Sequence, residues 1–254
     1  MIKSIALIHT SSTITEQQTQ QTVHCIERQY GCRVIYGEEC FKPMSAQQRA
    51  DKLMTYLCDD QIDLLWSVRG GEGSADLIPI LNQYATRIAQ QRPKYLLGLS
   101  DFTALLVYFS QCFNWPSIHG PGALQLSTNW LDQASLNNLK QWIQTEQYAT
   151  ISLMPLNATA KQQGTIQALC TGGNMSLLNI SINDIWQIDI TNQIVFIEDW
   201  HEKGYVIDRT LKYFMRIGLF KQAKALIFGD FQAGQFDSDP AQNKQQQRYL
   251  RKVL

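Results

Sequence analysis

Short apolar runs alternate with longer amphipathic stretches along the first half of the chain. Four runs have the length of buried strands, at 4–9, 33–36, 62–68 and 95–98. Four stretches between and after them repeat apolar residues at helical spacing, at 15–30, 45–59, 74–84 and 102–112. We expect Ser11, Ser12 or Thr13 to cap the first helix, Ser45 to cap the second, and Gly31 to end the first. Repeated strand–helix units predict a parallel sheet covered on both faces.

The pattern restarts in the second half of the chain, after a polar segment at 157–164. The second half predicts helices at 135–147, 175–181, 208–217 and 240–254, strands at 165–170, 193–199 and 225–231, and a turn at 171–174. We therefore predict an α/β protein with an N-terminal parallel-sheet α/β domain at 1–128. A linker region follows at 129–163, and a smaller C-terminal α/β domain occupies 164–254.

Composition narrows the possible partners. Lys+Arg and Asp+Glu both count 22, so no global field attracts nucleic acid or an anionic membrane. No run of about 18 apolar residues exists to span a membrane, and the first apolar run is too short for a signal peptide. The six cysteines form no C-x-x-C pair and fall at predicted core positions, which indicates reduced thiols in a cytoplasmic protein. No Cys or His cluster has the ligand spacing of a zinc site, so we expect no metal.

The most informative stretch is the one around Ser100. An apolar run ends at Gly98, Ser100 follows two residues later, and a helical pattern begins at once. A sharp strand-to-helix turn lifts one side chain above the sheet and aims the first helical N–H groups beside it, which suits a nucleophilic serine. The alternative is an ordinary helix N-cap, and Phe102 stands where a G-x-S-x-G motif has its second glycine. Both interpretations stay open on these residues alone.

A second turn, 69–74, also follows a buried strand and opens a helix. Its glycines allow backbone N–H groups to approach a ligand closely, and Arg69 can pair with a carboxylate through two hydrogen bonds. The spacing fits neither G-x-G-x-x-G nor a P-loop, and the alternative is a simple flexible turn. Because ligands sit beyond the carboxyl ends of parallel strands, this turn and Ser100 are expected to share one crevice.

Candidate acids and bases are few. Glu198 and Asp199 end an apolar strand and should face opposite ways, so one can orient a base while the other caps the next turn. The histidines are His9, His24, His119 and His201. His119 is expected at a strand end near the crevice, and a structural role is the alternative there.

Taken in order, these motifs resemble the LD-carboxypeptidase family of serine peptidases, which includes murein tetrapeptide carboxypeptidases and microcin C immunity peptidases. The blocks that carry the resemblance are 68–74, 77–81, 98–105, 119–121, 172–178 and 196–199, continuing through Tyr205 and 207–209 to Gly218 and 225–231.

The resemblance implies a role for several residues. Ser100 matches the nucleophile and Glu198 the acid of the triad, while the N–H groups of Gly71 and Asp101 form the oxyanion hole. One fixed donor there is worth roughly 3–4 kcal/mol. The resemblance implies a homodimer, and it implies neither a metal nor a cofactor. The candidate substrate-binding residues are Arg69, Gly70 and His119. Of these, Arg69 is expected either to pair with the terminal carboxylate of the substrate or to brace its own loop.

Two departures from the family pattern matter. Glu72 stands where members often carry an aromatic residue, and the sequence ends before the segment in which the family's triad histidine lies. We therefore expect an incomplete C-terminal domain, and three explanations stay open: a truncated enzyme, a natural pseudo-enzyme, or another histidine, His119 first, as the base. The expected function is hydrolysis of the amide to the terminal D-amino acid of murein-derived tetrapeptides. The alternatives are a catalytically silent peptide-binding protein and an immunity peptidase that acts on a peptidyl-nucleotide antibiotic.

Overall fold

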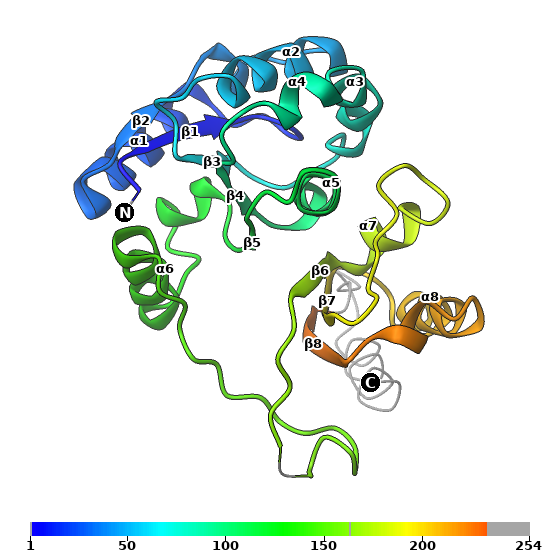
Figure 1. The fold of residues 1–254 in the computed structure, drawn as a ribbon. Helices are drawn as coiled ribbons and strands as arrows, with labels where there is room; N and C mark the ends of the chain where they lie inside the picture. The colour runs from blue at the N-terminus through cyan, green and yellow to red at the C-terminus, as the bar shows by residue number, and fades with distance from the viewer. Residues whose placement is uncertain (1, 163, 233–254) are drawn as a thin grey trace, which may run out of the picture.

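A five-stranded parallel sheet forms the centre of the N-terminal part. The structure is a computed structural model that describes residues 2–162 and 164–232. The strands are β1 (Ser4–Ile8), β2 (Arg33–Ile35), β3 (Leu64–Ser67), β4 (Tyr95–Gly98) and β5 (Ser117–His119). They lie in the order β2-β1-β3-β4-β5 (Figure 1). Because every neighbouring pair is parallel, the predicted parallel sheet is confirmed.

Helices cover both faces of this sheet, as the continuous apolar strands predict. One face carries α1 (Glu16–Tyr30) and α6 (Gln133–Thr145), and the other carries α2 (Ala46–Leu57), α3 (Ile78–Gln83) and α5 (Thr103–Phe113). Successive strand side chains alternate between the two cores: Leu7 and Trp66 pack with α1 and α6, whereas Ile8 and Leu65 pack with α2 and α5.

A smaller parallel sheet follows, which confirms the predicted second α/β unit. Its strands are β6 (Cys170–Asn174), β7 (Ile194–Trp200) and β8 (Ala225–Gln232), with helices α7 (Met175–Ile180) and α8 (Gly204–Arg216). Helix α5 contacts both β6 and α7. Met175 and Leu178 of α7 therefore belong to the same buried apolar cluster as Leu105 and Phe109 of α5. One continuous core joins the two sheets.

Several predicted boundaries were wrong in detail. Thr15 caps α1 in a capping box with Gln18, in place of the three residues expected, because its side chain lies directly before the first helical turn. The expected turn at 171–174 is part of strand β6. The helix expected at 74–84 forms as a 3₁₀ turn, Ala75–Leu77, that leads into α3, and α4 (Ala85–Ala89) follows it. The predicted caps Ser45 and Gly31 are confirmed. The helix expected at 240–254 lies outside the described residues.

The six cysteines are all unpaired and all lie within the described residues. Only Cys32 and Cys40 are buried, whereas Cys112 and Cys170 are exposed. The prediction that the cysteines occupy core positions is therefore right for two of them and wrong for the exposed pair.

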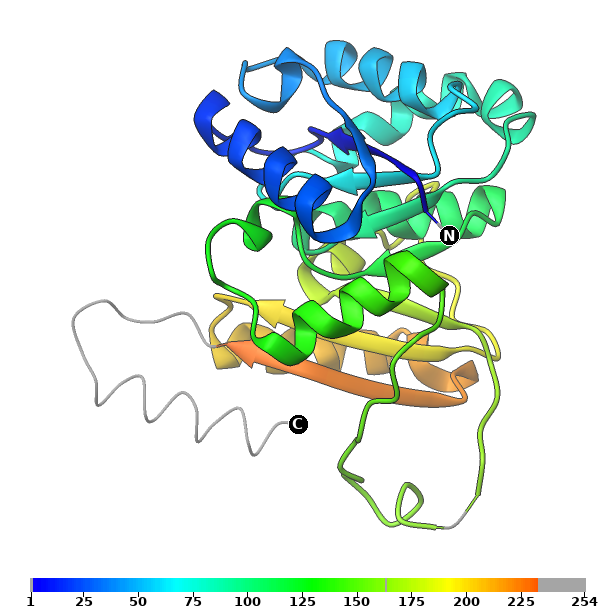
Figure 2. The same cartoon turned by 90° about the vertical axis from the view of Figure 1, so that its left-hand side faces the viewer.

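A long connection without regular structure, residues 147–169, runs from α6 to β6. We call it the connecting arm. It loops away from both sheets at the bottom of Figure 1, and the perpendicular view in Figure 2 shows the same separation.

Candidate active site

The predicted site residues gather where strands of the two sheets end. Gly70 and Gly71 follow β3, Ser100 follows β4, and His119 is the last residue of β5. Glu198 lies near the end of β7 in the second sheet. The carboxyl edge of the first sheet thus faces the end of the second, as expected for a ligand site in a parallel α/β fold.

Ser100 holds an unusual backbone conformation. Its φ is +57°, in the left-handed region that costs a non-glycine residue of order 1 kcal/mol or more. It begins the short helix Ser100–Phe102, which leads directly into α5, and its side chain caps neither helix. The N-cap interpretation is therefore wrong. The half-buried hydroxyl makes no hydrogen bond to any residue that the structure describes.

The glycine turn after β3 packs directly against this serine. A Cβ atom on Gly70 would lie 2.9 Å from the Ser100 Cβ and 3.1 Å from its Oγ. Gly71 has φ +147°, and a Cβ there would lie 2.1 Å from the Ser12 Oγ. Only glycine fits both positions without displacement, so the backbone of this turn lies alongside the Ser100 side chain.

Asp101 ties the two turns together. Its buried carboxylate accepts a hydrogen bond from the Ser74 backbone N–H at 2.8 Å, and another from the Ser11 hydroxyl. The Ser74 hydroxyl in turn donates to Thr10 Oγ1 at 2.9 Å. The Asp101 carboxylate thus holds together the segment after β1, the glycine turn at 69–74 and the turn that begins at Ser100. Sequence reasoning did not assign this role to the Asp101 side chain.

Glu198 meets His119 across the two sheets. The His119 Nε2 lies 3.6 Å from the Glu198 Oε1, and the imidazole lies 5.1 Å from the Phe196 ring. Burial, together with the nearby Asp199 carboxylate, raises the pKa of Glu198 to about 7. Burial lowers the pKa of His119 to about 4, so the imidazole is neutral at neutral pH.

This pair also leaves buried polar atoms unsatisfied. The Nδ1 of His119 and the Oε1 of Glu198 have no hydrogen-bond partner among the described residues. Such orphaned atoms at the ends of parallel strands are typical of a functional site, because a ligand, a water or a further residue would satisfy them.

Asp199 faces the opposite way from Glu198, as the strand pattern predicts. Its carboxylate accepts from the Asn174 side-chain amide at 2.9 Å and from the Ser176 hydroxyl at 2.8 Å. The Asn174 backbone N–H donates to Thr103 Oγ1 at 3.1 Å. These bonds fix the start of α7 against α5 and leave Glu198 as the carboxylate that faces the first sheet.

Other candidates lie on the surface. The side chains of Arg69 and Glu72 are exposed, and so is His201. Trp200 packs against Trp130, with ring centroids 5.5 Å apart. Trp130 was missed by sequence reasoning, because it lies 70 residues before its partner in a segment with no motif.

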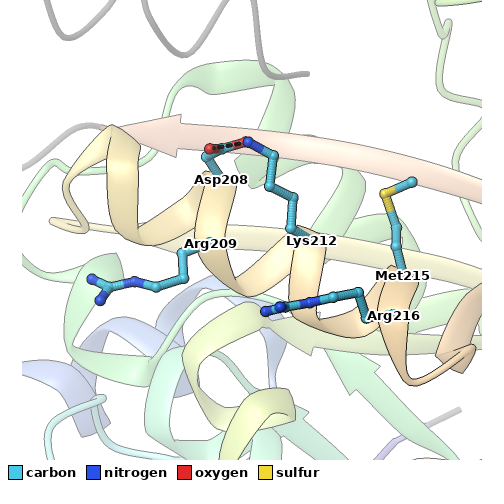
Figure 3. Close-up of a pocket in the computed structure, with 5 residues that line it drawn as sticks. All are labelled: Asp208, Arg209, Lys212, Met215 and Arg216. Carbon is cyan, nitrogen blue, oxygen red and sulfur yellow. Dashed lines mark hydrogen bonds and ion pairs between the residues drawn. The ribbon is translucent and has the colours of Figure 1, made fainter.

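A separate pocket of about 410 Å³ lies on α8 (Figure 3). Asp208, Arg209, Lys212, Met215 and Arg216 line it, and Lys212 Nζ lies 2.7 Å from Asp208 Oδ2. None of the predicted site residues contributes to it. Within residues 2–162 and 164–232, no group of three or more His, Cys, Asp or Glu side chains is placed to hold a metal ion. Nor does any helix in these ranges combine the length and apolar character needed to cross a bilayer.

Family models match most of the chain. The model of the LD-carboxypeptidase N-terminal domain covers residues 5–120, and that of the LD-carboxypeptidase C-terminal domain covers 167–254. A carboxypeptidase homologue of Rickettsia conorii is 34% identical over 197 residues, which are 77% of this chain and 62% of that protein. The murein tetrapeptide carboxypeptidase of Pseudomonas aeruginosa is 25% identical over 89% of this chain and 76% of its own length. A second relative, from Rickettsia prowazekii, is matched over 61% of its length. The chain therefore spans less than two thirds of the length of both Rickettsia proteins.

Solved structures share the fold. A muramoyltetrapeptide carboxypeptidase from Oxalobacter formigenes superposes with a TM-score of 0.80 at 21% identity, over 99% of this chain and 85% of the other. The microcin C7 self immunity protein in complex with aspartyl sulfamoyl adenosine gives 0.76 at 18% identity, over 99% and 84%.

Proposed function

The chain belongs to the LD-carboxypeptidase family, and we propose that it is a serine carboxypeptidase that removes the terminal D-amino acid from murein-derived tetrapeptides. The observation that carries the proposal is the arrangement at Ser100: a left-handed serine at a strand–helix turn, packed against a glycine turn. We further propose a cytoplasmic role in cell-wall recycling, without metal or cofactor.

In this proposal the Ser100 Oγ attacks the carbonyl carbon of the scissile amide. The N–H groups of Gly71 and Asp101 stabilise the negative charge that develops on the carbonyl oxygen. The base takes the proton of the Ser100 hydroxyl and gives it to the nitrogen of the D-amino acid as the C–N bond breaks. It then takes a proton from the water that hydrolyses the acyl-enzyme and returns it to the Ser100 Oγ. Arg69, on the exposed side of the glycine turn, receives the terminal carboxylate of the peptide.

A serine nucleophile also needs a base held by an acid. Glu198 is proposed as the acid, because its carboxylate is the one that faces the first sheet. Within the described residues, His119 is the histidine beside it, at 3.6 Å. The family resemblance places the triad histidine in a further C-terminal segment, so the test includes a chain extended by that segment.

The test measures D-alanine released from a murein tetrapeptide. We expect release that Ser100→Ala abolishes and that Ser110→Ala leaves unchanged, because among the described residues the Ser110 hydroxyl bonds to the Val107 carbonyl of its own helix α5. Release by the extended chain alone would assign the base to the added segment. If neither form released D-alanine, the proposed substrate would be wrong. Calorimetry with the same peptide then separates a silent binding protein, which binds without turnover, from a protein with another ligand.

A second candidate is an immunity peptidase for a peptidyl-nucleotide. The Trp130–Trp200 pair favours it, because exposed aromatic rings stack on nucleobases. Aspartyl sulfamoyl adenosine, which the microcin C7 immunity protein binds, is the probe. This reading predicts tryptophan quenching on titration that Trp200→Ala removes. Unchanged fluorescence and no heat of binding would reject it.

A further inference from the structure

Positive charge is concentrated in the segment that contains helix α8. Of the 22 Lys and Arg residues of the chain, six lie between 203 and 224: Lys203, Arg209, Lys212, Arg216, Lys221 and Lys224. Asp208 is the one acidic residue in that stretch of the sequence. A chain of zero net charge therefore carries a local excess of positive charge here, and such an excess attracts anionic ligands.

Three of these cations share the outward face of α8. At about 100° per residue, Arg209, Lys212 and Arg216 lie within about 60° of one another around the helix axis. All three side chains are exposed. The opposite face of the helix is anchored in the apolar core by Ile207, Leu211 and Phe214. The core thus holds in place the helix that presents these cations to solvent.

Two arginines in the pocket on this face have no acidic partner. Asp208 is paired with Lys212 at 2.7 Å, and Figure 3 shows Arg209 and Arg216 extending together to the other side of the helix. Among the residues that the structure describes, neither guanidinium forms an ion pair. Their charge is therefore available to a ligand, whereas the charge of Lys212 is largely offset by Asp208.

The dimensions of the pocket suit a small ligand with more than one anionic group. Its volume of about 410 Å³ lies within the range of small-molecule sites. Arg209 and Arg216 are seven residues apart, which separates their Cα atoms by about 10.5 Å along the helix. Each planar guanidinium can donate two parallel hydrogen bonds to a phosphate. Because both side chains extend to one side, a diphosphate can offer one phosphoryl group to each arginine.

Apolar surface lies beside these charges. The Arg209 guanidinium carbon lies 5.5 Å from the centroid of the Tyr205 ring, a contact that orients the guanidinium and leaves its edge free to donate. Tyr205 is 53% exposed, and Met215, which lines the pocket, is 66% exposed. A ligand with an organic part attached to its phosphates would cover these two side chains.

We propose that the pocket on α8 binds a small organic diphosphate, with Arg209 and Arg216 on its phosphoryl oxygens and Tyr205 and Met215 against its organic part. None of the predicted catalytic residues lines this pocket. The proposal is therefore independent of the catalytic assignment, and its readout is binding.

The test titrates inorganic pyrophosphate into the full chain by calorimetry at physiological ionic strength. Arg209→Gln with Arg216→Gln removes the two charges and keeps side chains that can form hydrogen bonds. The matched control, Arg28→Gln with Arg87→Gln, removes the same charge from exposed positions on α1 and α4. Because all four side chains are exposed, both double variants are expected to melt at the wild-type temperature.

We expect the wild type and the control to bind pyrophosphate at one saturable site, and the Arg209/Arg216 variant to bind at least about tenfold more weakly. Absence of saturable binding to the wild type would overturn the proposal. An equal loss in the control would do the same, because only net charge would then matter. So would a wild type that co-sediments with phosphatidylglycerol vesicles but binds no free pyrophosphate, since the face would then be a membrane contact.

Discussion

Ser100 stands in a left-handed conformation at the point where β4 meets α5. This conformation turns its hydroxyl away from both helix ends and toward the glycine turn. A side chain held in this way owes its position to its neighbours, because the backbone conformation is unfavourable in itself. The Ser100 hydroxyl is therefore sensitive to atoms added nearby.

Gly70→Ala tests this sensitivity. The new methyl group would lie 3.1 Å from the Ser100 Oγ, and Gly70 has no positive φ that would strain an alanine. We expect D-alanine release to fall about 100-fold, since small displacements at a reacting atom have effects of that size. Because the same methyl group would lie 2.9 Å from the Ser100 Cβ, the turn must shift, and we expect a loss of about 1–3 kcal/mol in the free energy of unfolding. Gly164→Ala, with nothing within 4 Å of its Cβ, is the control. Equal activity of the two variants would contradict the arrangement.

The raised pKa of Glu198 predicts that the free energy of unfolding depends on pH with a definite sign. Its pKa of about 7 in the folded protein exceeds the ordinary 4.5. The folded state therefore keeps a proton that the unfolded chain has released, and Glu198 makes the fold less stable as pH rises from about 4.5 to 7. Its side chain is 18% exposed, so solvent screening is limited.

Glu198→Gln removes this ionisation. Urea unfolding should show the variant gaining up to roughly 3 kcal/mol over wild type at pH 8 and little near pH 4. His119 titrates with the opposite effect, but it is present in both proteins and largely cancels in the difference. Glu27→Gln, exposed on α1, should give no such trend. A difference that stays constant across pH would contradict the raised pKa.

Local sequence patterns identified most of these residues but not their contacts. Ser100 and Gly70 are predictable because each sits next to its own strand end, where glycine and apolar runs are visible. The contact between His119 and Glu198 joins residues 79 positions apart on different sheets. Its distance, and the burial that shifts both pKa values, depend on how α5 and α7 pack, which no local pattern contains.

The turns that carry the site are connected through Asp101. Asp101→Ala would leave the Ser74 N–H and the Ser11 hydroxyl without their acceptor. We expect a loss of about 2–3 kcal/mol in the free energy of unfolding, with catalytic activity reduced further because the glycine turn loses its anchor. Chemical denaturation measures the first effect. Asp76→Ala, exposed in the next turn, should cost less than about 0.5 kcal/mol. Equal stability of these variants would refute the anchoring role.

Strand β6 shows where element prediction failed. Its Gly172 and Gly173 have φ of +123° and +137°, and a glycine pair in sequence resembles a turn. In the structure a Cβ on Gly172 would lie 1.8 Å from the Phe196 carbonyl oxygen. Glycine is needed at these positions because β7 approaches closely. This approach depends on tertiary packing, which the local sequence does not reveal.

The two sheets share one apolar core, and this predicts a single unfolding transition. Leu178→Ala, 1% exposed in α7, should destabilise both halves together by about 2–5 kcal/mol. Thermal melts followed by far-ultraviolet and near-ultraviolet circular dichroism should coincide before and after the change. Ile180→Ala, on the exposed side of the same helix, should shift the melt little. Two separated transitions would contradict a common core.

The shared core also decides how the chain can be cut. A gene divided in the connecting arm would yield two polypeptides, one ending with α6 and one beginning with β6. Each would expose to water the apolar face that α5 and α7 now bury against each other. Separate expression should therefore give poorly soluble pieces, whereas co-expression should let them reassemble. This makes the protein a natural starting point for a split reporter, in which recovery of the single cooperative melt reports that two fused partners have met.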